Sequence, residues 1–476
     1  METVLLYVLG VVIIVVGLVV SVGLHELGHM IPAKKFGVRV GQYMIGFGPT
    51  LWSRKIGETE YGIKAIPLGG YISMAGMFPP GRVRANDAAR AARSGSEVEL
   101  ELFEGDMHDS ADDARVRANR QVKMGSTGLF NALVQDARDS SAATIPAGDE
   151  ERVFYKLAFW KRIIIMLAGP AMNLVIAVVL YGIVLCGFGI PVATTTIGSV
   201  SECIATSAAQ TSCSADDQQS PANAAGLKPK DRIVSIDGVA IHSWDEETAA
   251  IRRSAGRPLQ FVIERDGQRQ TVQVTPVASS VVLTDSNGNA LTDSNGAQKT
   301  TTAGFIGIGP ASKVTPQPVT AVLPAVGDNV VRVGQIIIDL PHRLVQVAQA
   351  AFGGQKRDPN GPISVVGVGR LAGEVVSLNS VPIADRVSTV IGIVASLNVA
   401  LFVFNLIPLL PLDGGHVLGA VWEAVRRRFA KWFKRPDPGP VDMAKLIPLT
   451  LAVVAILGAS SALLIYADIV NPISIQ

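Results

Sequence analysis

Charged residues are scarce in this chain of 476 residues, and positive and negative charges are almost equal in number. Asp, Glu, Lys and Arg make up 17% of the sequence, whereas apolar types make up 48%. A typical soluble domain carries about 25% charged residues, so this balance argues against an ordinary soluble protein. The net charge is only +2, and no basic face with interleaved aromatic residues suggests nucleic acid, so we predict no nucleic-acid partner.

Four stretches carry no charge at all, and each is about as long as the 20 or so apolar residues that a membrane-spanning helix needs. They are Val4–Leu24, Ile163–Gly189, Val387–Ile407 and Leu446–Tyr466. The first could imitate a secretory signal peptide, but no basic residue precedes it and no small-residue cleavage site follows it. We therefore predict four transmembrane helices, the first of them retained.

Lysine and arginine are missing from some of the connecting segments, and this predicts the orientation. Neither residue occurs in Ile190–Leu227 or at either terminus. Basic residues instead follow the first and third helices and precede the second and fourth: Lys34, Lys35, Arg39, Lys156, Lys161, Arg162, Arg426, Arg427, Arg428, Lys431 and Lys445. Both termini are therefore expected outside the cytoplasm.

Histidine is rare as well, and two of the six histidines stand four residues apart in "HELGH", at the end of the first apolar stretch. Residues four apart share one face of a helix, so His25 and His29 can reach one metal ion, with Glu26 beside them. This is the H-E-x-x-H pattern of zinc proteases, with two ligands and a general base. The alternative is a chance match formed by hydrogen-bonded core histidines.

A catalytic zinc site usually has three protein ligands, and the sequence offers Asp413 as the third. It is the only acidic residue in the third apolar stretch and the "NLIPLLPLDGGH" segment that follows. The predicted topology places it at the same membrane level as HELGH. Pro408 and Pro411 would break the helix, and Gly414–Gly415 would let the backbone turn closely around a ligand. His416 is a rival third ligand.

Together, HELGH, "AGPAMN" at 168–173 and "NLIPLLPLDGGH" at 405–416 resemble the motifs of the site-2 protease family of intramembrane zinc metalloproteases. The order and spacing are similar to the bacterial branch with a PDZ domain between the second and third helices. The resemblance implies zinc ligands at His25, His29 and Asp413, Glu26 as the base, and Asn405 near the substrate backbone. It gives Asn173 only a packing or hydrogen-bonding role.

The resemblance also implies a function. A family member of this kind cuts transmembrane segments of other proteins in the bacterial plasma (inner) membrane, with its active site toward the cytoplasm. Its substrates include anti-sigma factors already cut by another protease, or signal-peptide remnants. The sequence leaves two alternatives, a catalytically inactive membrane PDZ scaffold and an ion-coupled transporter. Membrane lipid is the other partner expected.

Outside the helices, two segments have recognisable patterns. Residues 37–77 alternate in short runs punctuated by Gly and Pro, which predicts β-hairpins. Residues 78–152 are rich in Ala, charge and Gly/Ser, which predicts mobile or partly helical structure, with His108 as a solvated residue. A regulatory docking role for this insertion is a second interpretation.

The segment after the second helix resembles a PDZ domain through "SPANAAGLKPKDRIVSIDGVAIHSWDE". Asp266–Gly267 predicts a tight hairpin turn, and the near-duplication "LTDSNGNALTDSNGAQ" predicts a hairpin-like insertion. Cys203 and Cys213 could form a disulfide in an oxidising exterior, with two free thiols as the alternative. His242 and His342 have no metal-like spacing.

We therefore predict a multi-pass α-helical membrane protein with four transmembrane helices, a membrane-associated β-hairpin region and an α+β PDZ-like domain. Its predicted parts are the first helix with HELGH (1–36), the β region (37–77), a cytoplasmic insertion (78–155), the second helix (156–192), the PDZ-like domain (193–312), a post-PDZ segment (313–386), the third helix with NLIPLLPLDGGH (387–422), a basic cytoplasmic loop (423–445) and the fourth helix (446–470).

Overall fold

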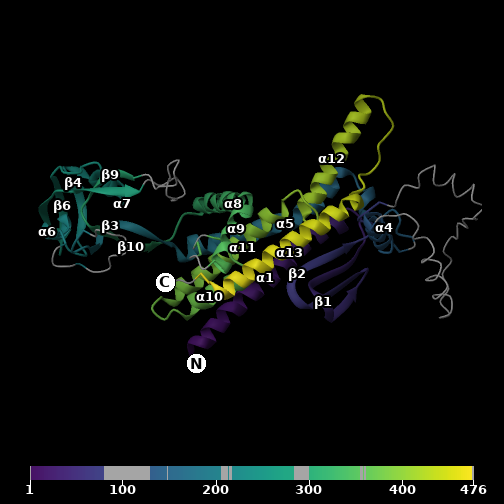
Figure 1. Ribbon diagram of the computed structural model, residues 1–476, viewed down its shortest axis with the longest axis horizontal. Coiled ribbons are helices and arrows are strands. Elements are labelled where there is room, and N and C mark those ends of the chain that lie inside the picture. The colour runs from purple at the N-terminus through teal and green to yellow at the C-terminus, as the bar shows by residue number, and fades with distance from the viewer. Residues whose placement is uncertain are drawn as a thin grey trace, which may run out of the picture. The chain divides into compact units, whose positions relative to one another are not determined.

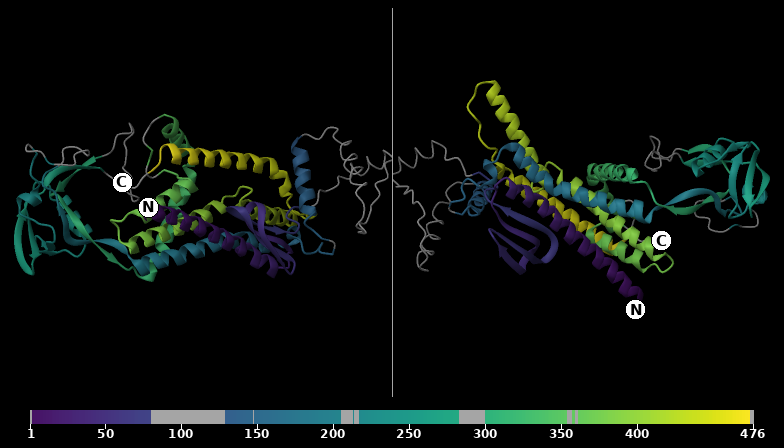
Figure 2. Two further views of the ribbon diagram at one scale, coloured as in Figure 1. Left: turned by 90° about the horizontal axis from the view of Figure 1, so that it is seen from below. Right: turned by 180° about the vertical axis from the view of Figure 1, so that it is seen from behind.

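Long helices dominate the larger of two units into which the chain divides (Figures 1 and 2). A computed structural model describes residues 2–79, 129–146, 148–204, 213, 217–282, 300–353, 357–358 and 361–473. One unit comprises Met1–Val184 and Val319–Gln476, and the other comprises Leu185–Pro318. The larger unit contains α1 (Glu2–Lys35), β1 (Val40–Ile56), β2 (Thr59–Met74), α4 (Leu129–Ala142), α5 (Phe159–Gly182), α8 (Val322–Ile338), α9 (Leu340–Phe352), α10 (Val365–Ser377), α11 (Ile383–Asn405), α12 (Asp413–Trp432) and α13 (Ile447–Val470).

Five helical segments of the described chain are long and apolar enough to cross a membrane. They are Thr3–Lys35, Phe159–Phe188, Val319–Ile338, Ile383–Asn405 and Met443–Val470. Four of them overlap the predicted apolar stretches, and the several apolar helices confirm the membrane-protein class. The segment containing α8 was not predicted, because Asp328 and Arg332 interrupt its apolar run.

Small residues let α1 lie close to its neighbours. A Cβ added at Gly10 would come within 2.6 Å of the Ala372 carbonyl of α10, and one added at Gly28 within 2.5 Å of the Ala168 carbonyl of α5. Glycine at such contacts allows two helix backbones to approach inside a membrane. Buried Asn398 of α11 adds a hydrogen bond of 2.9 Å to the Ser21 hydroxyl of α1. These contacts fix α1 against three other helices.

The β region is confirmed, and β1 and β2 form a hairpin as predicted, in which Ile56 lies opposite Thr59 across a two-residue turn. β1 and β2 pair antiparallel, with repeated shifts of register. Tyr43 lies opposite both Ile72 and Tyr61, so the first part of β1 has a partner on each side. Residues 70–74 therefore continue the sheet beside β1. Large apolar side chains on this sheet remain exposed, as expected for a membrane-associated surface: Phe47, Leu51, Trp52, Ile56, Ile63 and Ile66.

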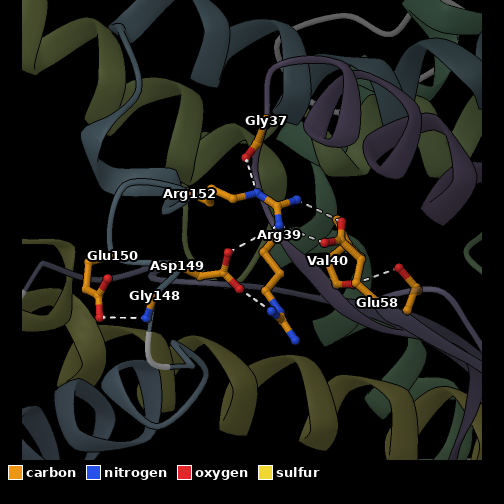
Figure 3. A network of polar contacts seen from close by, with 9 residues as sticks. Gly37, Arg39, Val40, Glu58, Gly148, Asp149, Glu150 and Arg152 are labelled. Atoms are coloured by element: carbon orange, nitrogen blue, oxygen red, sulfur yellow. Dashed lines mark hydrogen bonds and ion pairs between the residues drawn. The ribbon is translucent and has the colours of Figure 1, made fainter.

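A network of charged groups ties the sheet to the segment before α5 (Figure 3). Arg152 pairs with Glu58 at the β1–β2 turn at 2.8 Å and with Asp149 at 3.2 Å. Its Nε also donates to the Gly37 carbonyl just after α1. Arg39 at the start of β1 pairs with Asp149. The guanidinium of Arg152 holds the pKa of Glu58 below its ordinary value, so this network keeps its charges at neutral pH.

Two of the predicted segment types change in the structure. The predicted third helix is two helices, because α11 ends at Asn405 and α12 begins at Asp413. The turn between them contains both prolines, as predicted. The predicted basic loop (423–445) is helical as far as Trp432. Of the predicted insertion (78–155), residues 80–128 and 147 lie outside the described chain, as does His108, and α4 covers Leu129–Ala142.

The smaller unit is built on antiparallel strands. Its main sheet has the strand order β10-β3-β4-β6-β7, with β5 paired to β4, and β8 pairs with β9 in a second sheet. The strands and two short helices are β3 (Ile190–Val200), α6 (Pro221–Ala224), β4 (Arg232–Ile236), β5 (Val239–Ala240), α7 (Trp244–Arg252), β6 (Leu259–Arg265), β7 (Gln268–Val274), β8 (Val277–Val282), β9 (Thr300–Phe305) and β10 (Ile308–Thr315).

The smaller unit contains a tight hairpin turn and a disulfide. Asp266 and Gly267 both have positive φ and join β6 to β7, as the predicted hairpin turn requires. Cys203 and Cys213 form a disulfide. The near-duplication lies outside the described residues, although the strands on either side of it, β8 and β9, are paired.

One acidic side chain in this unit is buried without a partner. Glu247 of α7 has no exposed surface, and neither of its carboxylate oxygens has a hydrogen-bond partner among the described residues. Burial raises the pKa of Glu247 to about 8. An unfolded glutamate titrates near its ordinary value of 4.5. Between these two values the folded unit binds a proton that the unfolded chain has lost, so its stability falls as the pH rises.

We therefore expect Glu247→Gln to stabilise this unit above pH 8, because the neutral amide does not ionise. Between about pH 6 and about pH 9, the parent should lose on the order of a few kcal/mol of stability and the variant should not. Hydrogen exchange of peptides covering β4 and β6 in the full chain measures this difference. Asp245→Asn removes an exposed charge from the same helix and is the control. Equal pH dependence in the parent and Glu247→Gln would contradict the assignment.

Candidate metal centre

The structure brings His25, His29 and Asp413 together. His25 Nε2 lies 3.2 Å from His29 Nε2, and each of these nitrogens lies 3.3 Å from Asp413 Oδ2. In the described residues, this is the group of three side chains whose donor atoms are close enough to hold one metal ion. The histidines come from α1, and Asp413 is the first residue of α12.

The distances between the donors agree with a tetrahedral zinc site. Bonds of about 2.0–2.1 Å to imidazole nitrogen and carboxylate oxygen place two ligands of a tetrahedron about 3.3–3.4 Å apart. The three separations are 3.2, 3.3 and 3.3 Å. Asp413 Oδ2 is buried and has no hydrogen-bond donor in the described chain. Two imidazoles and one carboxylate are also a donor set that zinc uses in hydrolytic enzymes.

The far side of each imidazole is held by α5. His29 Nδ1 lies 2.7 Å from the Ile165 carbonyl; since a carbonyl only accepts, Nδ1 carries the proton and Nε2 is free to bind metal. Asn173 lies 3.1 Å from His25 Nδ1 through Nδ2, and its Oδ1 has no described partner. When the Asn173 amide is turned by half a rotation, Oδ1 accepts the Nδ1 proton of His25 and leaves its Nε2 free as well.

Space for the His29 ring depends on the absence of a side chain at Gly169. A Cβ added at Gly169 would overlap the His29 imidazole, with Nε2 as the nearest atom. Gly169 and Asn173 are four residues apart on α5, so one face of this helix supplies both the space and the hydrogen bond. The AGPAMN motif by itself predicts neither this role of Gly169 nor the role of the Ile165 carbonyl. Only the packing of α1 on α5 reveals them.

The turn before α12 brings Asp413 to the histidines. A Cβ added at Gly414 would overlap the carbonyls of Leu406 and Ile407, and one at Gly415 would lie 2.6 Å from the Leu410 nitrogen. The first turn of α12 therefore packs directly on the backbone of the preceding loop. This contact agrees with the close turn that Gly414–Gly415 predicts.

Glu26 lies between the two histidines on α1 and next to the β region. It is half-buried, and a Cβ added at Gly70 of β2 would lie 3.1 Å from Glu26 Cγ. The backbone of Ile72, also in β2, is within hydrogen-bond reach of its carboxylate. Residues 70–74 therefore lie directly beside the group predicted to act as the base.

The other predicted candidates are not among these three donors. Asn405 is the last residue of α11, half-buried, and its side chain has no hydrogen bond to a described residue. His416 is not part of the group of three donors. His242 lies just before α7 and His342 lies in α9, and neither belongs to a group of three possible metal ligands in the described chain.

Comparison with known proteins agrees with this geometry. The family model for "Peptidase family M50" matches residues 13–435. The zinc metalloprotease Rip1 of Mycobacterium tuberculosis (strain H37Rv) is 32% identical over 478 residues, covering 98% of this chain and 99% of Rip1. Rip1 of Mycolicibacterium smegmatis is also 32% identical, covering 98% of each chain. Zinc metalloprotease RasP of Geobacillus kaustophilus is 27% identical over 84% of this chain and 86% of RasP.

The fold and site thus define a membrane zinc metalloprotease. The chain belongs to peptidase family M50, the site-2 protease family, and its cofactor is zinc.

The contact between α5 and the His29 ring yields a prediction. Gly169→Ala should displace the ring and lower the zinc affinity of the purified full chain, measured by competition with a chelator, by at least about tenfold, as other changes behind a metal ligand do. Gly182→Ala alters the same helix at a position where an added Cβ meets nothing within 4 Å, and it should keep zinc. The same zinc affinity in Gly169→Ala as in the parent would show that the ring does not need this space.

Proposed function

We propose that this protein is an intramembrane endopeptidase that holds one zinc ion through His25, His29 and Asp413. The observation that carries the proposal is the convergence of these three donors at tetrahedral spacing beside Glu26. All three come from helix positions next to long apolar segments. A cluster of this kind is costly to keep at membrane depth without a function.

Each residue has a separate task in the proposed mechanism. A zinc ion held by His25, His29 and Asp413 would polarise the scissile carbonyl and lower the pKa of the attacking water, so that it loses a proton more easily. Glu26 takes a proton from the attacking water and passes it to the leaving nitrogen. The Ile165 carbonyl and Asn173 hold the two imidazoles in the tautomer that directs Nε2 inward. Asn405 is proposed to hold the substrate backbone near the bond to be cut.

The substrate must be extended where it is cut, because a helix hides its peptide bonds. Residues 70–74 of β2 pair with β1 and lie next to Glu26. A strand edge binds an extended peptide by adding it to the sheet. We propose that an unwound segment of the substrate pairs with this strand and so presents its backbone to Glu26. Sheet structure at this depth is tolerated only where it is covered by protein or lines a cavity.

The substrates proposed are transmembrane segments of other membrane proteins. Anti-sigma factors pre-cut by another protease, and signal-peptide remnants, are the two classes that the family resemblance suggests. Cutting such a segment releases a fragment into the cytoplasm, which is regulated intramembrane proteolysis.

We propose four membrane-spanning helices, α1, α5, α11 and α13, in a bacterial plasma membrane, with both termini outside and the zinc site toward the cytoplasm. The distribution of lysine and arginine supports this orientation. The disulfide in the smaller unit supports an oxidising exterior for Leu185–Pro318. Reaction of a cysteine introduced at Lys35 with an impermeant thiol reagent outside intact cells would contradict it.

For the smaller unit we propose a PDZ-like role. Its antiparallel sheet with two short helices is compatible with the resemblance in the sequence, and such domains bind extended peptides by strand addition. An inactive PDZ scaffold would also use this unit, but neither such a scaffold nor an ion-coupled transporter needs a carboxylate beside three converging metal ligands.

The test that separates these functions is Glu26→Gln. The amide is close in size but accepts no proton from water, so we expect cleavage of a transmembrane substrate to fall by at least about a hundredfold while the zinc content stays unchanged. Glu151→Gln, at a carboxylate that is 89% exposed, is the control and should cleave normally. Near-parent turnover by Glu26→Gln would end the proposal.

A further inference from the structure

Helix α12 extends beyond the metal centre, and its two faces differ. Figure 1 shows it projecting away from the other helices of its unit. One face is held by the protein: Glu423 is 1% exposed, pairs with Arg162 of α5 at 2.6 Å and accepts a hydrogen bond from the Val441 nitrogen at 3.1 Å. These contacts fix the first half of α12 on α5.

The opposite face carries an apolar stripe that the described chain leaves largely exposed. Its side chains recur at intervals of three and four residues, which places them along one side of a helix. The rings near its end stack on one another, with centroids 6.4–6.5 Å apart. The stripe consists of Leu418, Val421, Trp422, Val425, Phe429, Trp432 and Phe433, each between 38% and 78% exposed. A continuous exposed apolar surface formed by seven large side chains marks an interaction site.

Positive charge borders the stripe. Between Gly414 and Asp442 there are six basic residues, Arg426, Arg427, Arg428, Lys431, Lys434 and Arg435, and three acidic ones, Glu423, Asp437 and Asp442. Every acidic residue is already paired with an arginine. In the described part of the chain Arg428, Lys431, Lys434 and Arg435 form no ion pair, and all four are exposed. We call these four residues the basic rim.

The stripe is continuous with the surface of a candidate membrane-spanning helix. Leu418 and Trp422 of α12 line a largely apolar cavity of about 420 Å³ together with Leu446 and Leu449 at the start of α13. α13 is one of the candidate membrane spans, and Leu449 is 52% exposed on it. The stripe therefore begins where acyl chains would already cover α13, and it runs from there toward Phe433.

We propose that α12 is an interfacial helix that binds the surface of an anionic phospholipid bilayer. The apolar stripe enters the boundary between headgroups and acyl chains, and the basic rim binds lipid phosphates. Tryptophan and phenylalanine beside lysine and arginine are the residue types that favour this boundary. A second copy of the chain is a poorer occupant, because it would place two basic rims against each other.

Tryptophan fluorescence tests this proposal in the full chain. The protein is placed in nanodiscs of phosphatidylcholine with brominated acyl chains, with or without added phosphatidylglycerol. The emission of Trp432, obtained as the difference between the parent and Trp432→Phe, should be quenched in the anionic discs. The quenching should be at least about twofold weaker without phosphatidylglycerol or at high salt, because each basic residue near an anionic surface contributes severalfold to binding.

A charge variant identifies the groups responsible. Arg428→Gln with Lys431→Gln should reduce quenching in the anionic discs by at least about twofold. Arg269→Gln with Lys313→Gln removes one arginine and one lysine, both exposed, from the smaller unit and should have no effect. Unquenched Trp432 in anionic discs would overturn the proposal, and would indicate another occupant such as a protein. Equal quenching with and without phosphatidylglycerol would overturn the proposed preference for anionic lipid.

Discussion

The close contact between α1 and α5 is the constraint on which the metal centre depends. Gly28 lies against the Ala168 carbonyl, and Gly169 leaves room for the His29 ring. Because the two helices lie this close together, the Ile165 carbonyl and Asn173 of α5 can bond the Nδ1 atoms of the two imidazoles. A larger side chain at either glycine would separate the helices, and the imidazoles would lose their fixed orientation.

The second constraint is the turn that returns the chain to the site. α11 ends at Asn405, and the loop carrying Pro408 and Pro411 leads to Asp413 at the first position of α12. Glu423 then fixes α12 to α5 through Arg162. α5 therefore both supplies the hydrogen-bond partners of the histidines and holds α12. Both parts of the metal centre, the histidines and Asp413, are positioned by this one helix. The proposed attachment of the far end of α12 to lipid would restrain the same helix from its other end.

Much of this arrangement could be predicted from local patterns. The four-residue spacing of His25 and His29 places them on one helix face, and the scarcity of acidic residues singles out Asp413. The four apolar stretches and the Asp266–Gly267 turn were likewise visible in the sequence.

Features that depend on tertiary contacts could not be predicted in this way. Nothing local shows that Gly169 faces His29, or that Arg162 meets Glu423 across more than 250 residues of chain. α8 escaped notice because Asp328 and Arg332 interrupt its apolar run. The irregular register of β1 and β2 results from pairing on both sides of Tyr43, which alternation of residue types does not reveal. The first part of the predicted basic loop is helical. Its apolar residues recur at helical spacing, but the cluster of basic residues led to the prediction of a loop.

Zinc K-edge X-ray absorption of the purified full chain tests the central claim most directly. The account predicts one zinc ion with two imidazole nitrogens and oxygen ligands at about 2.0–2.1 Å, and loss of one oxygen ligand or of the metal in Asp413→Ala. A spectrum with three imidazoles, or one unchanged by Asp413→Ala, would contradict the assignment of Asp413 as the ligand that joins α12 to α1.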